Sequence, residues 1–540
     1  MKNRNLLIIV FCLLISVLLC ACNPNGSETN QDGKNSTKII FSDNGASVKG
    51  IGASAQGTDV RIGAAGTYTL SGSTSDGSVI IDAGKAEIVI VLDSLLLTNT
   101  DGPAIFVKNA KKVTFELPEG SNSILTDGNS YEIKEINTMV DGTIFAKSDL
   151  VFSGVGTLTV NGNNAHGIVA KDGLKISDSN INVVSKSAGV CGKDYIEIEN
   201  ANLNINSGTD GLRSDNVFDF NKGYIAIKSG SFNITSGGDA IQASDWVRIE
   251  GGNFNIKTTL IDPMLSMKGI KGTEGIEISG GNFVVDSIDD GLHSDADVMI
   301  LGGDISVSSG DDGVHANDKL TISGGNLTIS KSYEGLEATV IEIIDGRIEI
   351  VSTDDGINSA GGNDQSAGSD SFDGANGSFS IKGGYTVINS GADGIDVIGS
   401  FDMSDGVLVV NGPSKAKSGA IDFGSTSSIT GGVVVALGLS NTAKNFSNAT
   451  QGTVLFKNGS YDANAVYSIC DENGNVIIAF TSTEGFNGML VSAPELKQGN
   501  TYTVYINASV VGLDQNGFAH NTTQTDGEVL TSVTFDTLIK

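Results

Sequence analysis

The stretch Asp289-Asp290-Gly291-Leu292-His293-Ser294 is repeated 22 residues later, almost unchanged, as Asp311-Asp312-Gly313-Val314-His315-Ala316. Related phrases occur along much of the chain, separated mostly by steps of 22 or 29 residues. They begin at His166, Ala188, Asp210, Asp239, Lys268, Glu334, Asp355 and Asp393. Recurrence at such a period is typical of proteins built from stacked repeats.

A second phrase alternates with the first, as in Ile278-Ser279-Gly280-Gly281-Asn282-Phe283 and Ile322-Ser323-Gly324-Gly325-Asn326-Leu327. Each unit therefore contains two or three short alternating strands with glycine turns between them. A unit of this length buries no core alone, whereas stacked units close a continuous core and pair every strand with its neighbours. The repeat predicts an all-β fold, a right-handed parallel β-helix (solenoid); the handedness follows from the general preference of parallel crossovers.

Strand alternation predicts which side chains face the core. Leu292 and Ser294 are expected to point inward and His293 outward. Each inward Ile, Val or Leu should stabilise the stack by roughly 1.5 to 3 kcal/mol.

The repeat also predicts the domain organisation. Residues 39–130 are strand-rich but irregular and are expected to form an N-terminal cap with the first coils. Residues 131–430 carry the repeat, with a protruding Gly/Asp loop at 359–377, and residues 431–540 should form a C-terminal β-rich cap or small sandwich. Caps are needed because an open end of such a stack is an aggregating edge.

The first residues predict export. Lys2 and Arg4 precede the apolar run Leu6 to Leu19, which is too short for a lasting membrane span. The sequence Leu19-Cys20-Ala21-Cys22 resembles a bacterial lipobox, so residues 1–22 are interpreted as a lipoprotein signal peptide with Cys22 lipidated. The alternative is an ordinary cleaved signal and a free secreted protein. Residues 23–38 are polar and are expected to be a flexible tether.

The net charge restricts the classes of binding partner, and the cysteine content restricts the disulfides that we expect. With 33 Lys and Arg against 63 Asp and Glu, the net charge is −30, which disfavours nucleic acid and anionic membrane surfaces. Membrane contact is expected only through the lipid anchor. The two cysteines outside the targeting segment, Cys191 and Cys470, lie in different regions, so no disulfide framework is expected. We expect an extracellular, cell-surface monomer.

Stacking should bring the acidic turn residues into vertical columns about 4.8 Å apart. Carboxylates this close repel one another, so a bound cation, raised pKa values or interposed lysines must compensate. Calcium fits best, because it accepts six to eight oxygen ligands in flexible geometry. The alternative is that these are solvated turn residues, since Asp-Gly is a good turn pair in any case. The candidate calcium ligands are Asp289, Asp290, Asp311, Asp312, Glu334, Asp354 and Asp355.

A neighbouring column supplies candidate ligand-binding residues, namely His293, His315, Glu337 and Asn358. His293 and His315 should stack on each other. They are interpreted as exposed stacked imidazoles, with a transition-metal pair as the alternative.

Four phrases together resemble the bacterial carbohydrate-binding β-helix family described from clostridia. They are Gly66-Thr67-Tyr68-Thr69-Leu70-Ser71-Gly72, residues 117–128, Lys331-Ser332-Tyr333-Glu334-Gly335-Leu336-Glu337 and residues 354–362. The resemblance runs from about residue 38 to about residue 510. It implies a right-handed β-helix related in shape to pectate lyases, bound calcium held at the acidic positions named above, and binding to cellulose and polygalacturonate-like polymers without known cleavage.

Several functions are consistent with this sequence. The first is a non-catalytic, calcium-binding, carbohydrate-binding surface lipoprotein that recognises plant-type or acidic polysaccharides. The second is a calcium-dependent, pectate-type polysaccharide lyase, in which Lys268 or Lys271 would be the base beside the carboxylates. A glycosidase using paired carboxylates and an adhesive cell-surface protein are further alternatives. Trp246 is the single Trp, which disfavours a strip of stacking aromatics.

Overall fold

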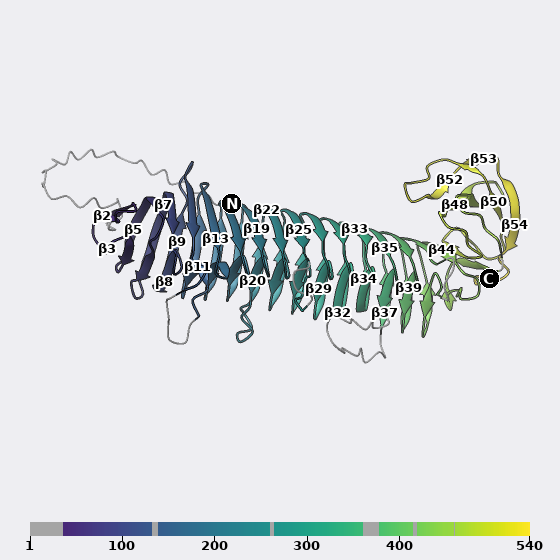
Figure 1. Ribbon diagram of the computed structural model, residues 1–540. Coiled ribbons are helices and arrows are strands. Elements are labelled where there is room, and N and C mark those ends of the chain that lie inside the picture. The colour runs from purple at the N-terminus through teal and green to yellow at the C-terminus, as the bar shows by residue number, and fades with distance from the viewer. Residues whose placement is uncertain (1–35, 132–138, 260–263, 360–376, 414–417, 458) are drawn as a thin grey trace, which may run out of the picture.

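The computed structural model describes residues 36–131, 139–259, 264–359, 377–413, 418–457 and 459–540. These residues form strands and turns without a helix, so the all-β prediction is confirmed. Forty-seven strands belong to one hydrogen-bonded sheet, most of which is parallel. Figure 1 shows an elongated stack of strands that ends in a separate β-rich region at the C-terminus.

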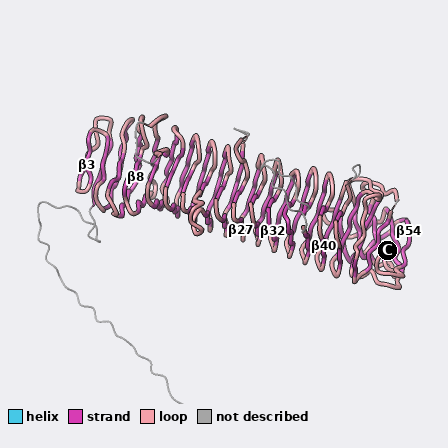
Figure 2. Tube along the Cα trace, turned by 90° about the horizontal axis from the view of Figure 1, so that it is seen from below, coloured by secondary structure: helices cyan, strands magenta, loops and turns pink. Residues whose placement is uncertain are grey.

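Most strands pair in parallel with the strand three places further along the chain. Thus β14 (His166–Ala170) pairs with β17 (Val190–Gly192), and β15 (Gly173–Ser177) pairs with β18 (Tyr195–Glu199). We call three successive strands a rung. The two quoted repeats lie in register, because Leu292 pairs with Val314. Figure 2 shows the chain passing from rung to rung along the stack. The predicted parallel pairing of successive repeats is confirmed.

The corresponding strands of successive rungs form three parallel sheets. Strands β32 (Val314–Ile322) and β34 (Leu336–Ile343) run through the corner between the first and second sheets, and β7 (Glu87–Thr98) runs through the corner between the second and third. The first sheet contains β4 (Asp59–Ile62), β6 (Val79–Asp82), β8 (Ile105–Asn109), β11 (Gly142–Ala146), β14, β17, β20 (Leu212–Ser214), β23 (Ile241–Ala243), β26 (Ile270–Gly272), β29 (Leu292–Ser294), β32 (Val314–Ile322), β34 (Leu336–Ile343), β36 (Ile357–Ser359), β39 (Ile395–Val397) and β42 (Asp422–Phe423).

The second sheet contains β9 (Lys112–Glu116), β12 (Asp149–Ser153), β15, β18, β21 (Tyr224–Ile227), β24 (Trp246–Ile249), β27 (Gly275–Ile278), β30 (Asp297–Ile300), the ends of β32 and β34, β37 (Ser378–Ile381), β40 (Ser400–Met403), β43 (Ser427–Ile429) and β45 (Asn448–Ala449). The third contains β7 (Glu87–Thr98), β10 (Asn122–Thr126), β13 (Thr157–Gly162), β16 (Asn180–Ser185), β19 (Ala201–Ser207), β22 (Gly230–Ser236), β25 (Asn253–Thr258), β28 (Asn282–Asp286), β31 (Asp304–Ser308), β33 (Asn326–Lys331), β35 (Arg347–Ser352), β38 (Tyr385–Ser390), β41 (Val407–Asn411) and β44 (Val433–Gly438).

Like side chains stack on one another in the core. The rings of Phe232, Phe254 and Phe283 lie parallel, with centroids 4.5 Å apart, and all three are buried. The glycines of the repeat are needed because the rungs approach so closely. A Cβ on Gly291 would lie 2.5 Å from the carbonyl oxygen of Gly313 in the next rung. Steric exclusion of a side chain therefore explains the recurring Asp-Gly turn.

The N-terminal end of the stack is covered by short antiparallel strands. Strand β1 (Ser36–Phe41) pairs antiparallel with β2 (Ser47–Lys49) and parallel with β5 (Gly66–Thr74), and β3 (Ala53–Gln56) forms a hairpin with β4. The expected tether ran to residue 38. Its last three residues instead begin β1, because Thr37 is buried and accepts and donates hydrogen bonds with the backbone of Ile51.

The C-terminal end departs from the parallel pattern. Strand β44 pairs antiparallel with β49 (Gly488–Ala493), which also pairs with β46 (Gly452–Phe456). A second sheet contains β47 (Val466–Cys470), β48 (Val476–Thr481), β50 (Thr501–Ile506), β52 (Phe518–Thr522) and β54 (Glu528–Thr534), and β51 (Ser509–Val510) pairs with β53 (Gln524–Thr525). A shared apolar core joins residues of β44, β49 and this second sheet. The stack therefore ends in a small two-layer sandwich.

Candidate functional site

The acidic column lies in the turns that lead into the first sheet. The Oδ1 atom of Asp290 accepts a hydrogen bond from the backbone N–H of Asp312, at 3.0 Å, and Asp312 Oδ1 accepts one from the N–H of Glu334, at 3.2 Å. Asp355 Oδ1 does the same for the N–H of Asp393, at 2.7 Å. The predicted vertical register of Asp290 and Asp312 is confirmed. One carboxylate oxygen of each of these residues thus fastens the next rung, which leaves the other oxygen for a cation.

Lys268 compensates the first acidic pair. Its Nζ lies 2.9 Å from Asp289 Oδ2 and 2.7 Å from Asp290 Oδ2, and its side chain is buried. Burial alone would lower the pKa of Lys268, but the charges of Asp290 and Asp289 outweigh it and raise the pKa. Asp311 also approaches this pair, and one oxygen from each of the three carboxylates lies within 4.8 Å of the others. An ammonium therefore already occupies the place that a metal ion would take beside Asp289 and Asp290.

His293 and His315 stack as predicted, with ring centroids 4.7 Å apart and an angle of 9° between the planes. The expectation that they are exposed is wrong, because the side chain of each is 4% exposed. His293 contacts Asp290 Oδ2 through Nδ1 at 2.7 Å and Asp295 Oδ1 through Nε2 at 2.9 Å. The rings point outward from their strands, but the flanking turns cover them, which strand alternation alone does not reveal.

The second cluster contains Asp312, His315 and Glu337. His315 Nδ1 lies 2.7 Å from Glu337 Oε2 and 3.2 Å from Asp312 Oδ2. Burial would lower the pKa of His315, but hydrogen bonds to Asp312 and Glu337 raise it to about 12. Burial, with the nearby charges of Asp290 and Glu337, raises the pKa of Asp312 well above its usual range. The positive charge of the His315 imidazole and a proton shared between Asp312 and Glu337 therefore offset the negative charge of this cluster.

The next acid of the turn column, Glu334, lies in the rung that follows Asp312. Glu334 is 7% exposed, and its Oε1 accepts a hydrogen bond from Asn358 Nδ2 at 2.9 Å. Its Oε2 is buried without a hydrogen-bond partner among the described residues. Burial, and then the charge of Glu337, raises the pKa of Glu334 to about 9. An unsatisfied buried carboxylate oxygen at this position favours either a proton or a cation.

The third cluster joins Asp355 to Asp393 and Asp396, whose ligand oxygens lie within 4.8 Å of one another. Burial raises the pKa of Asp355 to about 7, with the charges of Asp393 and Asp354 adding to the effect. Burial and Asp393 raise the pKa of Asp396 to about 6. Within the described part of the chain, these three carboxylates form no ion pair with a basic side chain.

Asp393 and Asp396 were absent from the predicted ligand set. Asp393 begins a repeat phrase of its own, so the phrase was a signal for it. It lies 38 residues after Asp355, and its phrase, Ala392-Asp393-Gly394, lacks the doubled acid of the phrases at Asp289 and Asp311. The predicted loop at 359–377 falls almost wholly outside the described residues.

Exposed aromatic side chains were also missed. Phe218 and Phe220 are 88% and 101% exposed in the turn between β20 and β21, and Val217 beside them is 71% exposed. The sequence contains one indication of this longer turn: the step from Asp210 to Asp239 is 29 residues instead of 22, which lengthens this rung. Trp246 is half-buried, with the Arg248 guanidinium 4.8 Å from its ring centroid.

The family of this chain follows from its match to a family model. The model of the carbohydrate-binding domain-containing proteins matches residues 56–313 and 311–465, which is more than half of the chain. This chain belongs to that family. The carbohydrate-binding family that the sequence phrases resemble is thereby confirmed, and the matched region contains the whole acidic column.

Two individual proteins are similar to this chain. A carbohydrate-binding domain-containing protein of Acetivibrio thermocellus is 34% identical over 186 residues, which is 33% of this chain and 64% of that protein. This chain thus spans a little under two thirds of that family member. A solved structure of a polysaccharide lyase-like protein from C. thermocellum, a gadolinium derivative, is similar with 30% identity and a TM-score of 0.40, covering 46% of this chain and 96% of that one.

The remaining predictions concern membrane attachment, the N-terminal segment and the cysteines. In the described ranges, from residue 36 onward with their gaps, the structure has no helix that is long and apolar enough to span a membrane. The predicted signal peptide, Cys22 and most of the predicted tether lie outside the described residues. Cys191 and Cys470 are both buried and unpaired, in line with the prediction of no disulfide.

Proposed function

We propose that this chain is a non-catalytic, calcium-binding carbohydrate-binding protein that recognises acidic or plant-type polysaccharides. We further propose that it acts as a monomer on the bacterial cell surface, anchored through a lipid on Cys22. The three sheets are inferred to wind as a right-handed β-helix, which presents a long face suited to an extended polymer. Membership of the carbohydrate-binding family supports the class of ligand.

The observation that carries the calcium proposal is the carboxylate cluster of Asp355, Asp393 and Asp396, which lacks a described ion pair to a basic side chain. Calcium binds oxygen at 2.3–2.6 Å, so two ligands on opposite sides of the ion lie about 4.8 Å apart. The three ligand oxygens of this cluster lie within 4.8 Å of one another, so no pair is too far apart for one ion to contact both. Hard carboxylate oxygens are also the ligands that calcium prefers over nitrogen or sulfur. Glu334, with its unsatisfied Oε2, offers a further ligand on the neighbouring rung.

The first two clusters fit calcium less well. Lys268 neutralises Asp289 and Asp290, and His315 neutralises Glu337 and Asp312. We therefore place the calcium site toward the C-terminal end of the column. Calcium held there would offer open coordination positions to the carboxylates of an acidic polysaccharide, bridging two negatively charged partners.

The geometry at Lys268 argues against the lyase alternative. A catalytic base has to be unprotonated, whereas the pKa of Lys268 is raised and two carboxylates hold its ammonium group in a buried position. Lys271 lies on β26 in register with His293 of the next rung, and is half-buried. Of the two lysines, Lys271 therefore remains the candidate base for the lyase alternative.

Two measurements test the proposal. We expect polygalacturonate to bind in calcium and to bind more weakly with chelator, as measured by isothermal titration calorimetry and on a glycan array. We also expect no rise in the ultraviolet absorbance of unsaturated uronate products. Calcium-dependent growth of that absorbance, abolished by Lys271→Ala, would establish a lyase instead. Equal binding in calcium and in chelator would refute the calcium site.

A further inference from the structure

We propose that the outer surface of the third sheet holds a second glycan site, which binds an extended, uncharged, hydroxyl-rich polysaccharide laid along the stack of rungs. The proposal rests on the proposed function only in taking the ligand to be a glycan. It uses different residues from the acidic column and needs no metal ion.

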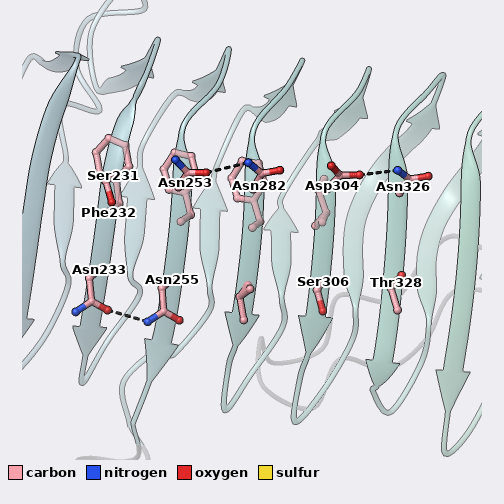
Figure 3. A pocket seen from close by; sticks show the side chains of 14 residues that line it. Ser231, Phe232, Asn233, Asn253, Asn255, Asn282, Asp304, Ser306, Asn326 and Thr328 are labelled. Atoms are coloured by element: carbon pink, nitrogen blue, oxygen red, sulfur yellow. Dashed lines mark hydrogen bonds between the residues drawn. The ribbon is translucent and has the colours of Figure 1, made fainter.

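The site is a groove of about 700 Å³ that crosses β22, β25, β28, β31 and β33. Two rows of outward side chains line it, and all of them are exposed. Figure 3 shows both rows running from strand to strand. The first row contains Ser231, Asn253, Asn282, Asp304 and Asn326, and the second contains Asn233, Asn255, Val284, Ser306 and Thr328.

Hydrogen bonds between rungs orient the amides of both rows. Asn282 Nδ2 donates to Asn253 Oδ1 at 2.8 Å, and Asn255 Nδ2 donates to Asn233 Oδ1 at 2.8 Å. An amide has two N–H donors and two acceptor lone pairs, and each of these bonds uses one donor of one amide and one lone pair of the next. Donors and acceptors of these four amides therefore remain available in a fixed orientation. Neighbouring sugar hydroxyls, each of which both donates and accepts, match such a surface.

The floor of the groove is rigid. Behind it, the buried rings of Phe232, Phe254 and Phe283 stack in the core at 4.5 Å. Because the strands are held by both neighbours, little conformational freedom would be lost on binding. Preorganisation of this kind raises affinity without further contacts.

Charge and spacing define the ligand. The lining contains no Lys, Arg or His, and Asp304 is its single charged residue, so a polyanion would gain no attraction there. Rungs are about 4.8 Å apart, and the five rungs of the groove span about 19 Å. One pyranose unit of an extended β-linked glycan is close to one rung in length. Successive sugar units can therefore meet successive rungs.

The test compares two double variants of the full mature protein. Asn253→Val with Asn282→Val removes a hydrogen-bonded amide pair inside the groove. Asn389→Val with Asn411→Val removes the same kind of pair, joined at 2.9 Å, on β38 and β41 of the same sheet but outside the groove. Asn253, Asn282 and Asn389 are exposed and Asn411 is half-buried. Valine suits both kinds of outward strand position, so both variants should keep the fold, which the thermal midpoint and circular dichroism will verify.

Binding of cellohexaose is measured by calorimetry in chelator. We expect the groove variant to bind about ten- to hundred-fold more weakly, given the usual contribution of two hydrogen-bonding groups, and the control variant to bind like the unaltered protein. Both variants should bind polygalacturonate in calcium normally. Unchanged cellohexaose affinity in the folded groove variant, or no cellohexaose binding by the unaltered protein, would overturn the groove site. Either result would leave the calcium site to be judged by polygalacturonate alone.

Discussion

Asp290 accepts, through Oδ1, a hydrogen bond from the backbone N–H of Asp312, the equivalent residue of the next rung, at 3.0 Å. Its Oδ2 faces Lys268 and His293, each at 2.7 Å. A single carboxylate therefore ties two rungs together and balances two buried basic groups. The repeated Asp-Gly turn thus serves both the stacking of the rungs and the charge balance of the column. Acids such as Asp290 have a structural role, whereas acids without such partners can hold a ligand.

Asp290→Asn should strongly destabilise the protein. Asparagine can still accept the hydrogen bond from Asp312, but Lys268 loses a buried counter-charge. Removing one partner of a buried pair costs about 3–5 kcal/mol. Chemical denaturation of Asp290→Asn, Lys268→Met and the double variant will check this as a double-mutant cycle. Additive losses in the cycle would show that the pair is not coupled.

Asp393→Asn should weaken calcium binding at least ten-fold, because it removes a carboxylate from the cluster with Asp355 and Asp396. The matched control is Asp345→Asn, since Asp345 is exposed in a turn and accepts a hydrogen bond from the following backbone N–H. Calorimetric titration with calcium alone is the measurement. Equal affinity in both variants would move the metal site elsewhere in the column.

Calcium binding should strengthen with pH between about 6 and 9. Asp396, Asp355 and Glu334 have raised pKa values of about 6, 7 and 9, so the calcium-free protein holds protons that the ion must displace. Calorimetry in two buffers with different ionisation enthalpies will count the released protons. Binding without proton release at pH 7 would contradict this prediction.

Without calcium, the protein should become less stable as the pH rises toward 9. The pKa of Glu334 is raised by burial to about 9, so the folded state binds a proton that the unfolded chain has lost above its ordinary pKa. Stability therefore falls from about pH 4.5 upward until the pH passes about 9. His315, with its pKa raised to about 12, adds a stabilising contribution that is complete below its ordinary pKa and is lost as the pH rises through about 12.

The neighbouring groups Glu337, Asp354 and Asp355 act on Glu334 in the same direction. Glu334→Gln should consequently flatten the pH dependence of the thermal midpoint, and saturating calcium should do so in the unaltered protein. Thermal unfolding from pH 5 to pH 9, with and without calcium, checks both. A midpoint independent of pH in the unaltered calcium-free protein would contradict the assignment.

Gly291→Ala should destabilise the stack by about 1–3 kcal/mol. The new Cβ would lie 2.4 Å from Val307 Cγ1 and 2.5 Å from the carbonyl oxygen of Gly313. Ser306→Ala, an exposed change on the neighbouring rung, should alter stability by less than about 0.5 kcal/mol. Denaturant unfolding distinguishes them, and equal stability would mean that the rungs can separate at this turn.

The acidic column has some features that the sequence predicted and others that it did not. The step of 22 residues between Asp290 and Asp312 predicted their vertical register, because equal repeats place equivalent residues above one another. The stacking of His293 on His315 followed from the same step. Their burial did not follow, since carboxylate and amide side chains of the flanking turns bond both nitrogens of each ring. Nor did the role of Lys268, which depends on where a long flexible side chain finds two carboxylates at once.

The sequence alone determined the class of fold, the pairing of successive repeats and the residues that share a column, because period and alternation are local properties of the chain. Only the tertiary structure decided which acids already have a basic partner. It brought Asp393 and Asp396 to Asp355 across an irregular step, and it placed the amides of β25 and β28 side by side in an open groove. Charge balance and concavity depend on distances between side chains in different rungs, and those distances exist only once the rungs are stacked.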